Sequence, residues 1–277
     1  MMGVTMLSPY HTSLYLQRLQ LDQAPPPDLQ GLRTLHLAHL MQIPFENLDI
    51  RAGLPISLEQ DALLDKILLR RRGGFCYELN LAFSWLLQSL GFQTRFWSAR
   101  VWNGKAYGPE FDHMLLAVQL EAQCWIADVG FGDSFRLPLL LAGAGNQELG
   151  VTYRCEADGA DWILLQQKAG HAATPQYRFQ TQAFQLDDFL PMFAYQQTSP
   201  NSHFTQKTIC SLPTADGRIS IADQKMIVTQ HGKRSVHSID SEAEYHALLQ
   251  HKMGMSAQQL PPFRARIHAQ AESASSP

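Results

Sequence analysis

The spacing of apolar residues divides the chain into a helical first third and a strand-rich remainder. Between residues 29 and 41, apolar side chains recur at steps of three and four, after Asp28 as a candidate cap and before the helix-ending Pro44. The same spacing predicts further helices at residues 13–19, at residues 58–69, and from Cys76 to near Gly91. Residues 1–90 are therefore expected to form a helical region.

After residue 93, short runs of branched and aromatic residues replace the helical spacing. Turn residues separate these runs, which is typical of an antiparallel sheet or barrel. Strands are predicted at 94–101, 113–120, 124–129, 150–155, 162–168, 177–181, 208–212, 218–222 and 226–229. Helices are predicted at 189–195 and 241–253, the second capped by Ser241, with an irregular stretch at 198–202 and a frayed tail at 269–277.

Composition narrows the class of protein. The 277 residues are 45% hydrophobic and 17% charged with a net charge of −3, which suits a globular protein and neither a nucleic-acid binder nor an anionic-membrane binder. The longest apolar run, residues 137–144, is far shorter than a membrane span, and the first residues do not read as a signal peptide. The four cysteines are widely spread, which indicates reduced thiols, so a cytoplasmic protein is expected.

One cysteine, Cys76, has the placement of a nucleophile. Two glycines at 73–74 precede it, and an apolar helical stretch begins with it. At a helix N-terminus, unpaired backbone N–H groups and the helix dipole favour an anion, and a thiol pKa can fall from about 8.5 to roughly 3.5–7.5. An inert buried thiol is the alternative for Cys76. It is the preferred interpretation for the other three, Cys124, Cys155 and Cys210.

A thiol nucleophile needs a base and a group that orients the base. His113, at the start of a predicted strand, is the best base, and Asp128, inside the apolar run Trp-Ile-Ala-Asp-Val, is the best orienting group. An acid in such a run needs a buried partner, which a histidine supplies. If the two strands are antiparallel neighbours, the two side chains can meet across the pair. Taken alone, His113 could also be an ordinary polar residue at a strand end.

Motifs for metals and nucleotides are weak. His36 and His39 lie on a predicted helix without a nearby acid or cysteine ligand set, so no metal site is expected. The run Gly-Phe-Gly at 130–132 lacks the later glycine of a dinucleotide fingerprint, and no phosphate-binding loop pattern occurs. The candidate chemistry therefore rests on the thiol.

Several blocks of sequence match one family, in the family's order. They are Ile-Pro-Phe-Glu-Asn-Leu at 43–48, Arg-Gly-Gly-Phe-Cys-Tyr-Glu-Leu-Asn at 72–80, His113 with its strand, Ala-Asp-Val-Gly-Phe-Gly at 127–132, and the weaker Asn-Ser-His-Phe at 201–204. With these motifs the chain resembles the arylamine N-acetyltransferases, and in particular their bacterial members.

The resemblance implies a fold and a reaction. The fold would be α+β with a papain-like thiol-enzyme core. Residues 1–90 would form an N-terminal helical bundle with the nucleophile, 91–196 an antiparallel β-barrel-like middle with the histidine and aspartate, and 197–277 a C-terminal α/β lid. Acetyl-CoA would be the donor, and aromatic amines, hydrazines or arylhydroxylamines the acceptors, as in xenobiotic metabolism. No metal, nucleic acid or membrane partner is implied.

The same motifs imply roles for individual residues. The catalytic triad would consist of Cys76, His113 and Asp128. The ring of the acceptor would lie against three aromatic side chains, Phe45, Phe131 and Phe204. Backbone at two glycines, Gly130 and Gly132, would approach the pantetheine or pyrophosphate arm of coenzyme A. Near the site, Glu46 and Arg72 would form a structural ion pair.

One position departs from the family pattern. A hydroxyl residue often precedes the catalytic histidine in this family, whereas Asp112 does so here. A carboxylate at this position would repel a phosphate-bearing donor, or would favour the charged form of His113. Because of this departure, the efficiency with which the protein uses coenzyme A thioesters has to be tested.

Two other classes of function are compatible with these residues. A thiol hydrolase, an amidase or another acyltransferase would use the same core, because transfer and hydrolysis share the acyl-cysteine intermediate. Slow decay of that intermediate without an amine would favour transfer. A binding protein with an inert Cys76 would show no preferential alkylation of this thiol near neutral pH. The acyl chain, the physiological acceptor and the oligomeric state are left open by the sequence.

Overall fold

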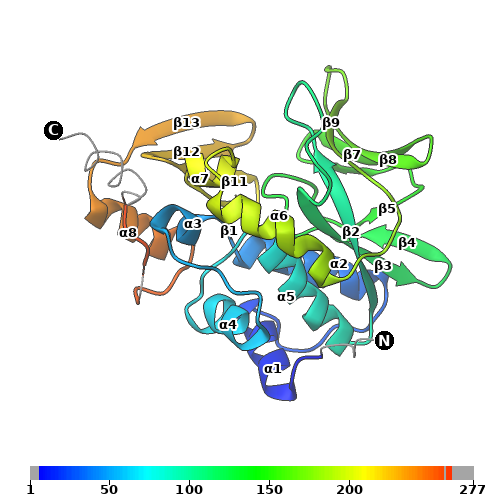
Figure 1. Cartoon of the computed structure of the whole chain (residues 1–277), viewed down its shortest axis with the longest axis horizontal. Helices are drawn as coiled ribbons and strands as arrows, with labels where there is room; N and C mark the ends of the chain where they lie inside the picture. The colour runs from blue at the N-terminus through cyan, green and yellow to red at the C-terminus, as the bar shows by residue number, and fades with distance from the viewer. Residues whose placement is uncertain (1–5, 259, 264–277) are drawn as a thin grey trace.

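The computed structural model describes residues 6–258 and 260–263, so the tail predicted at 269–277 lies outside the described residues. In Figure 1, the blue and cyan helices of the first ninety residues occupy the lower and central part of the molecule, a larger antiparallel sheet in green lies at the right, and a smaller one, mostly yellow to orange, lies at the upper left. This mixture of helices and sheets confirms the predicted α+β class. Across the described residues, no helix combines the length and hydrophobicity that a bilayer crossing requires.

The helical part follows the predicted pattern with local differences. Its elements are α1 (Pro9–Arg18), α2 (Leu29–Gln42), α3 (Leu48–Ala52), α4 (Gln60–Leu64), the π-helical η1 (Asp65–Leu69) and α5 (Cys76–Ser89). Asp28 caps α2 as predicted, by accepting a first-turn N–H. The prediction that the first helix begins at residue 13 is wrong. α1 begins at Pro9, because Ser8 caps it and proline is well suited to the first helical position.

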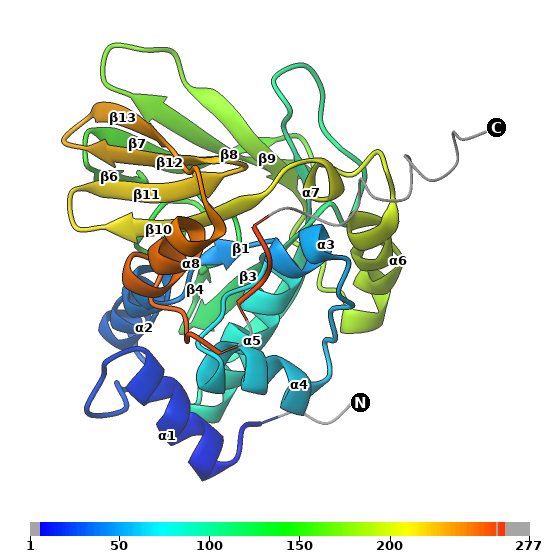
Figure 2. The same ribbon diagram turned by 90° about the vertical axis from the view of Figure 1, so that its left-hand side faces the viewer.

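The larger sheet is antiparallel and lies behind the smaller sheet in the view of Figure 2. Its strands, in spatial order, are β5 (Leu139–Leu140), β4 (Gln123–Ile126), β3 (His113–Leu120), β2 (Gln93–Val101), β9 (Thr174–Phe179), β8 (Asp161–Lys168), β7 (Val151–Asp158) and β6 (Asn146–Glu148). β5 also contacts β7, so the two ends of the sheet approach each other. The strand predicted at 124–129 ends at Ile126, because the chain leaves the sheet there and turns toward α5.

The smaller sheet pairs a short strand from the N-terminal helical part with four strands from the last third of the chain. Its strands, in spatial order, are β1 (Phe45–Glu46), β10 (Ile209–Thr214), β11 (Gly217–Ala222), β12 (Lys225–Gln230) and β13 (Lys233–Ser238). α8 (Glu242–His251) follows the predicted cap Ser241 and packs Tyr245 and Leu249 against this sheet. β13 was not predicted, because all its residues are exposed and its sequence lacks apolar alternation.

Two helices connect the sheets. α6 (Leu186–Thr198) is longer than predicted, and α7 (His203–Gln206) follows the stretch predicted to be irregular. α6 buries Phe189 and Phe193 in the same core as α5. The division of the chain at residues 90 and 196 stays a prediction.

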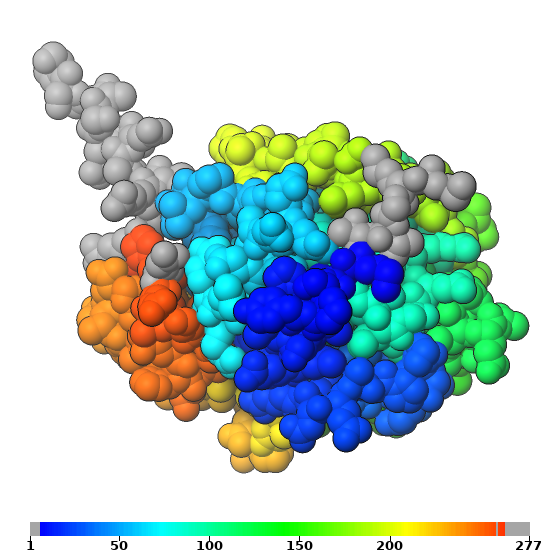
Figure 3. Space-filling model, turned by 90° about the horizontal axis from the view of Figure 1, so that it is seen from below, coloured from blue at the N-terminus to red at the C-terminus, as the bar shows by residue number. Residues whose placement is uncertain are grey.

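Seen from below, the N-terminal helices and the C-terminal part of the chain lie side by side (Figure 3). Orange and red residues of the C-terminal part lie directly beside the cyan residues around α4. Two hydrogen bonds connect these segments. The Ser256 N–H donates to the Arg70 carbonyl oxygen at 3.2 Å, and Arg71 Nε donates to the Gly254 carbonyl oxygen at 3.3 Å. The C-terminal part is therefore fastened to the turn that precedes α5.

Candidate functional site

Cys76 is the first residue of α5 and is only 3% exposed. The approach to it is tight. A Cβ at Gly73 would overlap the Pro44 carbonyl oxygen, and one at Gly74 would lie 2.7 Å from the side chain of Glu78. Glu78 accepts the N–H of the residue before the helix at 3.2 Å, which completes the cap. The two glycines and this cap fix the position of the thiol at the helix start.

His113 and Asp128 meet beside β3 and β4. His113 is the first residue of β3, and its Nε2 lies 2.7 Å from Oδ2 of Asp128. The two strands are antiparallel neighbours, with Ala117 opposite Ile126. In this register the two side chains are not directly opposite, so Asp128 reaches His113 diagonally from beyond the end of β4. The expectation that the side chains meet across neighbouring strands is therefore met, by a diagonal contact.

Asp128 is buried and accepts four hydrogen bonds. Oδ1 accepts Nδ2 of Asn80 and the N–H of Gly130, both at 2.9 Å, while Oδ2 accepts the Tyr177 hydroxyl at 3.1 Å and the imidazole of His113. Burial would raise the pKa of Asp128, but the charge of His113 and the hydrogen bonds from His113, Asn80 and Gly130 lower it below the ordinary value. The group is therefore a carboxylate near neutral pH.

The same pair determines the state of His113. Burial lowers the pKa of His113, but the charge and hydrogen bond of Asp128, with further contributions from Cys76, outweigh burial and raise it to about 10. Because Nε2 is bound to Asp128, Nδ1 is the ring nitrogen left to exchange a proton with Cys76. The imidazole is thus oriented to act as base and acid beside the thiol.

A cleft of about 630 Å³ opens beside Cys76 and His113. The three aromatic residues expected to contact an acceptor all line it, Phe45, Phe131 and Phe204. The Phe131 ring packs edge-on against His113, with ring centroids 5.1 Å apart. The volume falls in the range of small-molecule pockets, about 300–1,000 Å³.

The two glycines expected near coenzyme A lie differently. Gly130 lines the cleft, and a Cβ there would lie 2.7 Å from the Cα of Cys76. Gly132 is not among the described residues that line the cleft, has a φ of +83°, and packs against the ring of Phe45. Gly130 therefore permits close packing on α5, and Gly132 supplies a left-handed turn.

We expect Gly130→Ala to damage the site locally. The added methyl would press on the Cys76 backbone, at a cost of about 1–3 kcal/mol in unfolding free energy. The shift should also slow alkylation of Cys76 by iodoacetamide, because the thiol would move away from His113. Urea unfolding and alkylation rates measure the two effects. Gly159→Ala is the control, since φ is +64° there but no described atom lies within 4 Å of the new Cβ. Equal slowing of alkylation by both variants would contradict the expectation.

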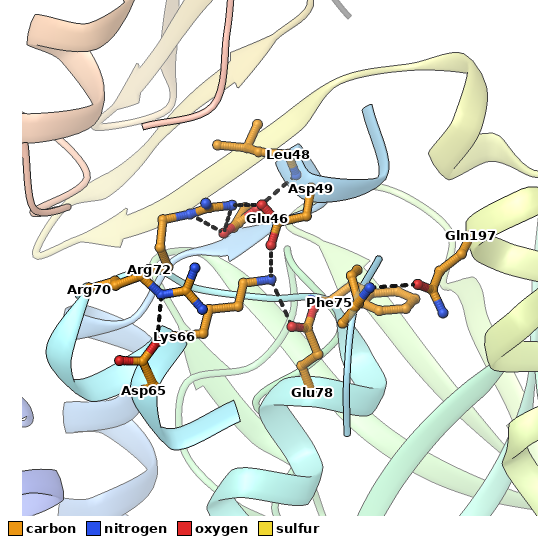
Figure 4. Close-up of polar contacts among 11 residues, drawn as sticks. Glu46, Leu48, Asp49, Asp65, Lys66, Arg70, Arg72, Phe75, Glu78 and Gln197 are labelled. Atoms are coloured by element: carbon orange, nitrogen blue, oxygen red, sulfur yellow. Dashed lines mark hydrogen bonds and ion pairs between the residues drawn. The ribbon is translucent and has the colours of Figure 1, made fainter. Parts of the chain in front are cut away.

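A buried group of charges lies beside the start of α5 (Figure 4). Lys66 lies 2.7 Å from both Asp49 and Glu78, and Arg72 lies 2.8 Å from both Glu46 and Asp49. The expected ion pair of Arg72 and Glu46 is therefore present, within a larger network. Burial raises the pKa of Glu78 to about 7 despite the opposing charge of Lys66. This network connects β1 and α3 to the helix that carries the thiol.

Two site residues were missed in the sequence. Asn80 donates Nδ2 to the Met114 carbonyl oxygen at 2.7 Å and accepts the Val129 N–H at 3.0 Å, so it ties α5 to β3 and to the segment beyond β4. The sequence does contain an indication of this role, because Asn80 lies four residues after Cys76 and therefore on the same face of the helix. Tyr177 comes from β9, far along the chain, and no local pattern indicates its contact with the site.

The histidines at 36 and 39 have other partners. His36 contacts the carbonyl oxygen of Arg136 at 2.9 Å, and His39 contacts the hydroxyl of Tyr15 at 3.0 Å. Among residues 6–258 and 260–263, no three His, Cys, Asp or Glu side chains gather in an arrangement that would hold a metal ion.

A thiol at a helix start, an imidazole bound to a buried carboxylate, and an aromatic cleft beside them define a class of protein. This is the arrangement of enzymes that work through a covalent intermediate on cysteine.

Comparison with known proteins gives the family. The family model described as N-acetyltransferase matches residues 28–260. An arylamine N-acetyltransferase of Mycolicibacterium smegmatis is 35% identical over 238 residues, which are 83% of this chain and 86% of the relative. The arylamine N-acetyltransferase structure from Salmonella typhimurium aligns with a TM-score of 0.85 at 31% identity, over 97% of this chain and 99% of the other. The Mycobacterium marinum structure in complex with CoA aligns with a TM-score of 0.80 at 28% identity, over 88% and 92%. The chain belongs to the arylamine N-acetyltransferase family and is an acyltransferase.

Proposed function

We propose that this enzyme transfers an acetyl group from acetyl-CoA, through an acetyl-cysteine at Cys76, to an aromatic amine, a hydrazine or an arylhydroxylamine. The observation that carries the proposal is the bond of 2.7 Å between His113 and Asp128 beside the Cys76 thiol, at an aromatic cleft. A similar solved protein is described as a complex with CoA, which supports the choice of donor.

In the first half-reaction, the Cys76 thiolate, paired with protonated His113, attacks the carbonyl carbon of the donor thioester. The first-turn N–H groups of α5 have no acceptor within the helix and would stabilise the oxyanion. When the tetrahedral intermediate collapses, the bond between the carbonyl carbon and the coenzyme A sulfur breaks. The imidazolium returns the proton to the departing thiolate, and Asp128 stabilises the charged ring during this step.

In the second half-reaction, the acceptor nitrogen attacks the acetyl-cysteine and His113 takes the proton that the nitrogen loses. An aromatic amine is a weak base, so it is neutral near pH 7 and can attack directly. The ring of the amine would lie against three aromatic side chains that line the cleft, those of Phe45, Phe131 and Phe204. We assign coenzyme A to the same cleft, with its arm approaching the backbone at Gly130, whereas Gly132, also expected to contact the arm, lies outside the lining of the cleft.

Brief incubation with acetyl-CoA should add one acetyl group to the protein, and Cys76→Ala should remain unmodified. Intact-protein mass spectrometry measures both, with alkylation of the other thiols as a check that the variant is folded. Addition of an aromatic amine or hydrazine should then discharge the acetyl group. A protein whose Cys76 alkylates rapidly but gains no acetyl group would contradict acetyl-CoA as the donor.

The decay of the acetyl-enzyme separates transfer from hydrolysis. We expect slow decay in buffer and fast decay with an arylamine, because an amine nitrogen is a stronger nucleophile than water and the aromatic side chains of the cleft bind an aryl ring in preference to water. Decay that is equally fast with and without the amine would favour the hydrolase alternative.

A further inference from the structure

The cleft contains one carboxylate that the proposed reaction does not use. Asp112 directly precedes His113 and lines the cleft with it. Gln196 of α6 donates its Nε2 to Oδ1 of Asp112 at 2.7 Å. The side chain is therefore fixed against α6, at the wall of the cleft.

Burial and polar contacts act on Asp112 in opposite directions. Burial is the larger influence and leaves the pKa of Asp112 above its ordinary value, although the charge of His113 and the hydrogen bond from Gln196 oppose the rise. The Gln196 donor is an N–H group, and such a donor stabilises a carboxylate over the protonated acid. Because His113 and Gln196 both stabilise the anion, Asp112 is expected to carry negative charge near neutral pH.

No cation of the cleft wall is left to balance this charge. The described residues that line the cleft include neither lysine nor arginine. The positive charge of His113 is already paired with Asp128 at 2.7 Å. Burial, together with the charge of nearby Lys207, lowers the pKa of His203, the other histidine in the wall, so this ring is neutral near pH 7. Among the described residues that line the acceptor site, Asp112 therefore supplies the unbalanced charge.

We propose that Asp112 makes the acceptor site selective by charge, so that it favours neutral or cationic arylamines and hydrazines and discriminates against acceptors that carry a carboxylate or sulfonate. This inference rests on the proposed function, since it concerns the second substrate of that reaction. At an effective dielectric constant of about 20, one unit charge at about 8 Å changes an equilibrium by roughly 30-fold. The solvent in the open part of the cleft reduces this effect, and we expect about tenfold discrimination.

A matched series of acceptors tests the selectivity. The probes are 4-aminophenylacetate, 4-aminophenylacetamide and (4-aminobenzyl)trimethylammonium, in which a methylene group insulates the aniline nitrogen from the charge. Discharge of the isolated acetyl-enzyme is followed by mass spectrometry, and each rate is divided by that of the same amine with a simple thioester in solution. The wild-type enzyme should discharge to the anion about tenfold more slowly than to the neutral amide, and to the cation at least as fast. Equal normalised rates for the three amines would overturn the proposal.

Two variants of Asp112 test whether this side chain is the source of the selectivity. Asp112→Asn keeps the size of the side chain, and Asp112→Thr retains an oxygen acceptor for Gln196 if the first variant does not fold. In either variant the ratio of neutral to anionic rates should approach one, whereas the control Glu110→Gln removes an exposed carboxylate outside the cleft and should keep the wild-type ratio. An unchanged ratio in the Asp112 variants would also overturn the proposal. Failure of every amine to discharge the enzyme would instead contradict the proposed function.

Discussion

Asp128→Asn should lower the rate of Cys76 acetylation by about 10⁴-fold, the size of loss seen when the acid of a Ser-His-Asp triad becomes an amide. The carboxylate accepts the imidazole Nε2 at 2.7 Å, which leaves Nδ1 to serve the thiol. An amide does not stabilise an imidazolium, and it allows the tautomer that places the proton on the wrong nitrogen. Single-turnover mass spectrometry with acetyl-CoA measures the rate.

Tyr177→Phe is the matched control for this prediction. It removes only the hydroxyl that donates to Asp128 at 3.1 Å. The hydrogen bond between Asp128 and His113 stays in place. We expect a loss of about 1.5–3 kcal/mol in unfolding free energy, because the lost hydrogen bond involves a charged group. Acetylation should fall far less than in Asp128→Asn. Equal losses of rate in the two variants would mean that general disruption of the site, rather than orientation of His113, explains the effect.

The fold was predictable from the sequence where local chemistry determines it. The cap Asp28 and the start of α5 at Cys76 follow from a side chain or a glycine turn next to an apolar helical pattern. β1 and β13 were missed, because β1 has only two residues and forms by pairing with β10, and β13 is exposed throughout. A strand of this kind is defined by its neighbour in space, so its own sequence carries little signal.

The site shows the same division. Cys76, His113 and Asp128 each stand out in the sequence, because each has an unusual residue type for its local pattern. Lys66 is different, since in the sequence it reads as an ordinary helix residue, yet it is buried between two carboxylates. Tyr177 becomes part of the site only when β9 pairs with β2. Contacts made by tertiary pairing are therefore the ones that sequence patterns omit.

Arg72→Met should destabilise the protein by about 3–5 kcal/mol, the cost of leaving buried charges without their partner. Arg72 is 2% exposed and binds Glu46 and Asp49, each at 2.8 Å. After the substitution, Lys66 would be the remaining cation of a network with three buried acids, Glu78 among them. Urea unfolding measures the change. Arg154→Met is the control, because its partner Glu156 is 53% exposed and the pair should contribute less than about 1 kcal/mol.

A double variant separates two explanations of that loss. If the cost comes from unpaired buried charge, then removing Glu46 together with Arg72, as in Glu46→Met with Arg72→Met, should recover part of the stability. Recovery would be incomplete, because Glu46 also accepts the Leu48 N–H at 2.7 Å and helps to start α3. If the double variant is less stable than Arg72→Met by the full effect of Glu46→Met alone, the two residues act independently. The ion pair of Glu46 and Arg72 would then not determine the position of the turn before Cys76. Packing of that turn against β1 would have to explain the position of the turn.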